Sequence, residues 1–102
     1  MAAGNGNAFV AVSDGVYRLE APLTFASVAG LRQQGVKIID SQSQGLTLNL
    51  KAVPAVDSAG LALLIDWLRE ARARSRPLKY SEPPPALLSL ARLSDVEKLI
   101  AQ

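Results

Sequence analysis

The chain contains no cysteine and no histidine, and these two absences exclude much of the chemistry that enzymes use. Without cysteine there is neither a disulfide framework nor a thiolate nucleophile. Without histidine there is no Ser-His-Asp triad, no imidazole proton shuttle and none of the commonest zinc sites. The GxxxxGK phosphate loop and the GxGxxG dinucleotide fingerprint are missing too. We therefore predict a protein that binds partners without catalysis, and we expect no cofactor and no metal.

Long apolar runs and strong net charge are also missing. No apolar run approaches the roughly 20 residues of a membrane-spanning helix, so we expect no direct insertion into a membrane. Residues 1–7 lack the basic and apolar regions of a secretory signal, which favours a disordered tail on a cytoplasmic protein. The net charge of +2 is too small to indicate a nucleic-acid partner. The length of 102 residues fits a single domain, expected over residues 8–102.

Basic residues nevertheless cluster in the second half of the chain. The ordinary interpretation is that most of them end a helix, where cations complement the negative end of its dipole. The alternative is contact with an acidic partner surface or with anionic lipid headgroups. No aromatic residues interleave with the cluster, which argues against single-stranded nucleic acid. The cluster comprises Arg69, Arg72, Arg74, Arg76 and Lys79.

The order of apolar patterns predicts a mixed α/β sheet covered by helices. Two strands with a turn at Ser13-Asp14-Gly15 form a hairpin, and strands and helices then alternate. Such alternation implies mostly parallel strands with an antiparallel pair at one side, and one face of so small a sheet can remain open. The expected strands are 8–12, 16–20, 46–50 and 77–81. The expected helices are 25–34, 58–75 and 86–93, followed by a last turn or two through Ile100.

Local signals set the expected ends of these helices. Thr24 is the expected cap of the first helix, with Phe25 on its apolar face. Gly35 is its expected end, although the apolar pattern continues for another turn through Ile39. Ser94-Asp95 is expected to cap the final turn.

The helix expected from residue 58 to 75 carries two groups of apolar side chains. One group projects to a single side and forms the expected core stripe. Leu63 and Trp67 lie well away from the centre of that stripe, beside charged residues. Because aromatic side chains anchor interfaces, one hypothesis places both on a partner surface; the other covers them with a loop or the C-terminal helix. The stripe comprises Leu61, Leu64, Ile65, Leu68 and Ala71.

The start of this helix carries the most informative polar residues. Asp57 or Ser58 can cap it by accepting hydrogen bonds from the first free amides. Ser58 is also at a natural position for phosphorylation, because a phosphate there would lie in the favourable field of the helix dipole. Gly60 weakens the first turn relative to alanine, and its expected use is to let another backbone segment come close.

From Leu46 to Leu68 the chain resembles the STAS domain family. The resemblance rests on an apolar strand, a loop, the motif Asp57-Ser58-Ala59-Gly60-Leu61 and the following Ala62-Leu63-Leu64. It extends more weakly to the whole chain through the order of elements. The family includes anti-sigma factor antagonists and the small STAS subunits of bacterial phospholipid-transport ABC systems of the Mla type. The resemblance implies a STAS-like mixed four-stranded sheet with helices packed on it.

The two branches of the family imply different partners. In the transporter branch, the helix start and flank contact the cytoplasmic ATPase subunit, in complex with a permease at the inner face of the cytoplasmic membrane. In the antagonists, the serine matching Ser58 is phosphorylated by a partner kinase. The transporter branch is more similar in length and in Gly60–Leu64, but it often has threonine at Ser58, so both branches remain open. The implied partner-binding residues are Asp57, Ser58, Ala59, Gly60, Leu63 and Trp67.

Overall fold

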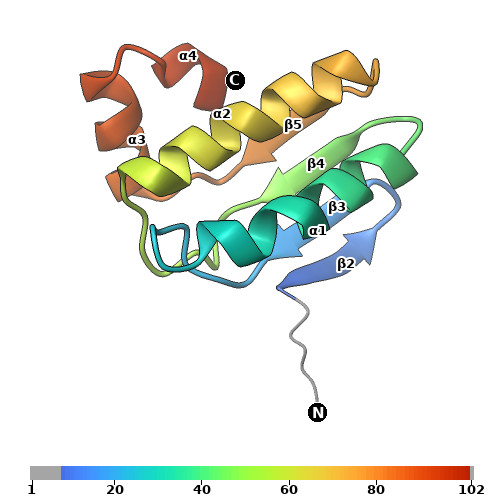
Figure 1. Ribbon diagram of the computed structural model, residues 1–102, viewed down its shortest axis with the longest axis horizontal. Coiled ribbons are helices and arrows are strands. Elements are labelled where there is room, and N and C mark those ends of the chain that lie inside the picture. The colour runs from blue at the N-terminus through green and yellow to red at the C-terminus, as the bar shows by residue number, and fades with distance from the viewer. Residues whose placement is uncertain (1–7, 102) are drawn as a thin grey trace.

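The computed structural model describes residues 8–101 and arranges them as one mixed sheet with helices on it (Figure 1). Chain order alternates strands with helices after an initial hairpin, as the sequence predicts. None of the helices in this range is long and apolar enough to cross a membrane. The predicted tail, residues 1–7, lies outside the described residues. The strands are β2 (Phe9–Ser13), β3 (Val16–Leu19), β4 (Leu46–Asn49) and β5 (Leu78–Ser81), and the helices are α1 (Val28–Ser41), α2 (Ser58–Ala73), α3 (Pro85–Leu93) and α4 (Glu97–Ile100).

The strands lie in the order β2-β3-β4-β5. β2 pairs antiparallel with β3, whereas β3, β4 and β5 are parallel, which confirms the predicted mixed sheet. Figure 1 shows α1 and α2 on the same face of the sheet, with α3 and α4 beyond α2. Because side chains alternate along a strand, Leu46 and Leu48 are buried under the helices while Thr47 and Lys79 lie on the opposite face.

The indole of Trp67 packs between the two long helices and the sheet. It is 1% exposed and meets Phe9 in an edge-on contact, with ring centroids 5.7 Å apart. A Cβ at Gly35 would overlap this indole, so glycine is needed here for close packing. The expectation that Gly35 ends the first helix is wrong: α1 continues through it to Ser41, and Ile39 is buried in the core.

The first helix also begins later than predicted. Residues 24–27 form a turn, and α1 starts at Val28. In this turn Ser27 Oγ donates to the carbonyl of Pro22 at 2.6 Å and accepts from the amide of Thr24 at 3.0 Å. Thr24 is therefore not the cap, and Phe25, expected on the apolar face, is instead 82% exposed.

The helices α2 and α3 end in the same way, each with a non-glycine residue at positive φ. Ser75 has φ 55° and Asp95 has φ 59°. After each helix, two consecutive backbone amides turn back to its last carbonyls, for example Arg76 N to Ala71 O at 2.9 Å. The expectation that Asp95 caps the final turn is wrong, because it terminates α3 and the N-cap of α4 is Val96.

Candidate partner-binding site

Asp57 joins the start of α2 to the turn that precedes α1. Its Oδ1 accepts from the backbone amides of Ala59 at 2.9 Å and Gly60 at 3.1 Å. Its Oδ2 accepts from the backbone amide of Phe25 at 3.0 Å. The predicted capping role of Asp57 is confirmed, and the carboxylate has a second role as a clamp on the 24–27 turn.

The three amides also act on the titration of Asp57. The hydrogen bond from Phe25 is the strongest influence, and together with those from Gly60 and Ala59 it lowers the pKa of this carboxyl below its usual value. The carboxylate is therefore ionised at neutral pH, and the clamp is present.

Gly60 permits a second backbone segment to lie against α2. A Cβ at this position would overlap the carbonyl of Leu23, so the predicted close approach is confirmed. Two backbone hydrogen bonds hold that segment in place. The amide of Leu23 donates to Ala55 O at 2.9 Å, and the amide of Asp57 donates to Leu23 O at 3.0 Å. The two loops at the start of the helices are thus held together by backbone contacts.

Ser58 is the first residue of α2 and is exposed. It follows directly after the Asp57 clamp in the chain. Ala59 lies beside it and is half-buried. The structure therefore brings Asp57, Ser58, Ala59 and Gly60 together at one place, as expected for consecutive residues at a helix start.

Trp67 is not on this surface, and the hypothesis that it anchors a partner is wrong for this structure. Its Nε1 donates to the carbonyl of Arg32 at 3.2 Å, inside the contact between α1 and α2. Leu63 is buried as well. The alternative hypothesis correctly expected both to be covered, but the covering element is α1. A helix flanked by a second helix buries a wider arc than the stripe facing the sheet, and periodicity within α2 does not reveal this.

A shallow apolar groove runs between α1 and α2, beginning beside Ser58. Its volume is about 490 Å³. Leu63 contributes to this groove although little of its surface is exposed. Arg32 and Asp66 form an ion pair of 2.8 Å among the groove residues. The lining comprises Val28, Ala29, Arg32, Gln33, Ala59, Ala62, Leu63 and Asp66.

Phe25 is the residue of this surface that sequence reasoning missed. Its backbone is fixed to Asp57, next to Ser58, and its ring is almost fully exposed. The sequence assigned Phe25 to the helix core because it lies three residues before Val28. Pro22 and the small polar residues around Phe25 are turn signals, and they favour a turn at Phe25 over a helix.

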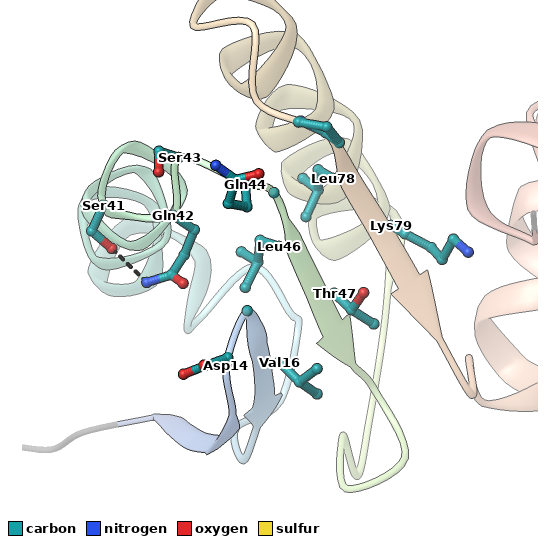
Figure 2. Close-up of a pocket in the computed structure, with 13 residues that line it drawn as sticks. Asp14, Val16, Ser41, Gln42, Ser43, Gln44, Leu46, Thr47, Leu78 and Lys79 are labelled. Atoms are coloured by element: carbon teal, nitrogen blue, oxygen red, sulfur yellow. Dashed lines mark hydrogen bonds between the residues drawn. The ribbon is translucent and has the colours of Figure 1, made fainter.

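A second concavity lies at the opposite end of the sheet, where β4 and β5 begin. Its volume is about 620 Å³. Figure 2 shows polar side chains, among them Asp14, Gln42 and Lys79, together with apolar ones in its lining. A hydrogen bond of 3.0 Å from Gln42 Nε2 to Ser41 Oγ is drawn there. None of the predicted site residues contributes to it. Within residues 8–101 there is also no cluster of acidic side chains arranged to hold a metal ion.

Solved structures with the same arrangement define the class of fold. A putative anti-sigma factor antagonist from Thermotoga maritima superposes with a TM-score of 0.73 at 14% identity, over 90% of this chain and 80% of that one. The anti-sigma factor antagonist SpoIIAA in its unphosphorylated form superposes with a TM-score of 0.69 at 20% identity, over 90% of this chain and 83% of that one. These proteins share the fold of this chain, a mixed four-stranded sheet with helices packed on it, as the resemblance implied.

The family follows from the sequence match. The family model described as "Mlab, STAS domain" matches residues 11–101, and the chain belongs to this family. A curated relative, the intermembrane phospholipid transport system binding protein MlaB of Haemophilus influenzae, is 40% identical over 53 residues. That match covers 52% of this chain and spans about half the length of the relative, 50%.

Proposed function

We propose that this protein is a non-catalytic accessory subunit of a phospholipid-transport ABC system and that it binds the cytoplasmic ATPase of that system. Membership of the MlaB-type STAS family and the name of the Haemophilus relative support this function. The observation that carries it is the exposed ring of Phe25, held beside Ser58 at one end of an apolar groove. Binding takes place at the inner face of the cytoplasmic membrane, through the transporter.

The surface has the features of a preorganised docking site. A phenylalanine side chain that becomes fully buried contributes about 1.5–3 kcal/mol to binding. The clamp from Asp57 and the backbone contacts of Leu23 hold the turn that carries Phe25, so little ordering is required when a partner binds. The apolar groove offers room for a side chain of the partner next to this anchor.

The replacement of Phe25 by alanine tests the proposal. Loss of the ring is expected to weaken binding to the purified ATPase at least about tenfold, measured by titration calorimetry, since about 1.4 kcal/mol corresponds to this factor. Leu93→Ala is the matched control, because Leu93 is 85% exposed on α3 and lies outside this surface. Equal affinity of the Phe25 variant and the wild type would remove this surface from the interface.

A second candidate function is that of an anti-sigma factor antagonist switched by phosphorylation of Ser58. The accessible hydroxyl at the first position of α2 favours it. The fold also matches SpoIIAA of Bacillus in its phosphorylated form, with a TM-score of 0.65 at 20% identity over 90% of this chain and 86% of that one. A phosphate on Ser58 would stand beside the Asp57 carboxylate, where like charges repel and weaken the clamp on Phe25.

The Ser58→Asp variant tests this second function. It is expected to retain its fold and to lose binding to an anti-sigma factor kinase, whereas Ser58→Ala is expected to bind like the wild type. A Ser58→Asp protein that binds the kinase with undiminished affinity contradicts the switch. Capture of an ATPase with its permease, and of no kinase, assigns the protein to the transporter.

A further inference from the structure

A pocket of about 350 Å³ lies at the far end of α2 from the docking surface. Ser58 begins α2 and Arg72 lies near its end, so these two residues are about 21 Å apart along the helix axis. The pocket is formed where the C-terminal end of α2, the start of β5 and α4 come together. Its lining combines two arginines and a serine, Arg72, Ser75 and Arg76, with an apolar floor that includes Leu68, Leu78 and Leu99.

Three of the seven arginines of the chain, Arg69, Arg72 and Arg76, form no ion pair with an acidic residue in the described range, and two of these three line the pocket. Arg18, Arg32, Arg74 and Arg92 each form an ion pair with a carboxylate. Arg72 and Arg76 form none with any acidic residue in the described range, and the pocket lining contains no carboxylate. Neither guanidinium group therefore has a carboxylate within ion-pair distance among the described residues.

The side chains of Arg72 and Arg76 do not donate hydrogen bonds to the last carbonyls of α2 in the described structure. The last carbonyls of α2 already accept backbone amides: Ala71 O accepts from Arg76 N at 2.9 Å, and Arg72 O accepts from Ser75 N at 3.0 Å. Arg76 Nη2 donates to Asp40 O at 3.2 Å, while its Nε is buried without a partner among the described residues. A buried guanidinium N–H without an acceptor is unfavourable, so a small change in the Arg76 side chain that brings this N–H to an anion in the pocket would be favoured.

Ser75 contributes a hydroxyl to the same lining. Its φ of 55° lies in the left-handed region, as is usual for the residue that ends a helix in this way.

We propose that this pocket binds the phosphate group of a phosphate ester, with the ester's organic part over the apolar floor. Two guanidinium groups and a hydroxyl supply three separate sets of donors, which match the three terminal oxygens of a phosphomonoester better than the two oxygens of a carboxylate. The two positive charges balance a phosphate dianion. The apolar side chains of Leu68, Leu78 and Leu99 favour an ester whose organic part is apolar.

A titration of the full chain followed by NMR tests the proposal. With phenyl phosphate as the probe, we expect saturable shifts of the backbone amides of residues 72–78 and of the Arg76 Nε–H signal. Phenyl phosphate is expected to bind more tightly than inorganic phosphate, because only the ester has an apolar part for the floor. Arg72→Gln is expected to weaken binding at least about tenfold, since a charge-assisted hydrogen bond contributes about 1.5–3 kcal/mol.

Arg69→Gln is the matched control, because Arg69 is an exposed arginine of the same helix that does not line the pocket. It is expected to bind phenyl phosphate like the wild type. Equal affinities of the wild type and Arg72→Gln, or no saturable shift up to about 10 mM phenyl phosphate, overturn the proposal. Both substitutions are at exposed positions, so loss of the fold is not expected to obscure the result.

The source of the phosphate is decided by a second arm of the experiment. In this arm the protein is sedimented with vesicles of phosphatidylcholine, with or without phosphatidic acid. If the wild type sediments only with the vesicles that contain phosphatidic acid, and Arg72→Gln does not, the ester is a lipid headgroup. Binding of phenyl phosphate without binding to these vesicles identifies it as a soluble ester. The docking proposal is tested by Phe25→Ala at the other end of α2, so failure of one proposal is distinguishable from failure of the other.

Discussion

Two glycines of α1 offer a direct test of how Trp67 is packed. Gly30 and Gly35 both lie within the helix, where alanine is intrinsically more favourable than glycine by about 0.8–1 kcal/mol. A Cβ at Gly30 meets no atom within 4 Å, whereas a Cβ at Gly35 overlaps the indole of Trp67. The same substitution is therefore expected to have opposite effects at the two positions.

The magnitude of the Gly35→Ala effect follows from the contacts that the indole would lose. Overpacking of a core costs about 1–3 kcal/mol, and displacement of the indole breaks the 3.2 Å bond from Trp67 Nε1 to Arg32 O, worth about 0.5–1.5 kcal/mol. After the gain in helix propensity, a net loss of about 1–3 kcal/mol in the free energy of unfolding remains. Gly30→Ala is expected to gain up to about 1 kcal/mol.

Urea denaturation followed by fluorescence measures both effects, because Trp67 is the single tryptophan of the chain. Gly35→Ala is expected to lower the midpoint and to shift the emission of the folded state to longer wavelength, while Gly30→Ala raises the midpoint with unchanged emission. In a double-mutant cycle, which is followed by circular dichroism because the Trp67→Phe variants lack tryptophan, Trp67→Phe is expected to reduce the cost of Gly35→Ala, since the smaller ring leaves room for the methyl group. If the two alanine variants are equally stable and have the same emission, the packing argument is refuted.

Two further predictions concern Tyr80 and Asp57. Tyr80 is buried and its hydroxyl donates to Leu64 O at 2.6 Å, so Tyr80→Phe is expected to cost about 0.5–1.5 kcal/mol in urea denaturation; a variant as stable as the wild type would contradict this contribution. The pKa of Asp57 is lower in the folded state than in the unfolded chain, where it is near 3.8. The ionised carboxylate therefore stabilises the fold at every pH above that unfolded pKa, and this stabilisation is lost as the pH falls through the folded pKa. The Tm difference between the wild type and Asp57→Asn is therefore expected to be constant above about pH 5 and to shrink at lower pH, and a difference independent of pH would show that the charge is not involved.

The start of α2 was predictable from the sequence because its interactions are local. Asp57 reaches the amides of Ala59 and Gly60 through contacts two and three residues along the chain, which any helix start with this motif can form. The hairpin and the mixed pairing of the strands were predictable for a similar reason, since they follow from the alternation of apolar patterns and short turns. Both kinds of signal are contained within a few neighbouring residues.

Tertiary structure alone decided which side chains are exposed around that start. Trp67 is buried because α1, 35 residues away in the chain at Arg32, packs over it, and Gly35 makes the space. Phe25 is exposed because the carboxylate of Asp57, 32 residues away, holds the turn outside the helix. That no described carboxylate lies within ion-pair distance of Arg72 or Arg76 is likewise visible only when the carboxylates of the other elements have been placed. Periodicity describes how side chains are arranged around one element, but burial and charge compensation depend on elements that the folded chain brings beside it.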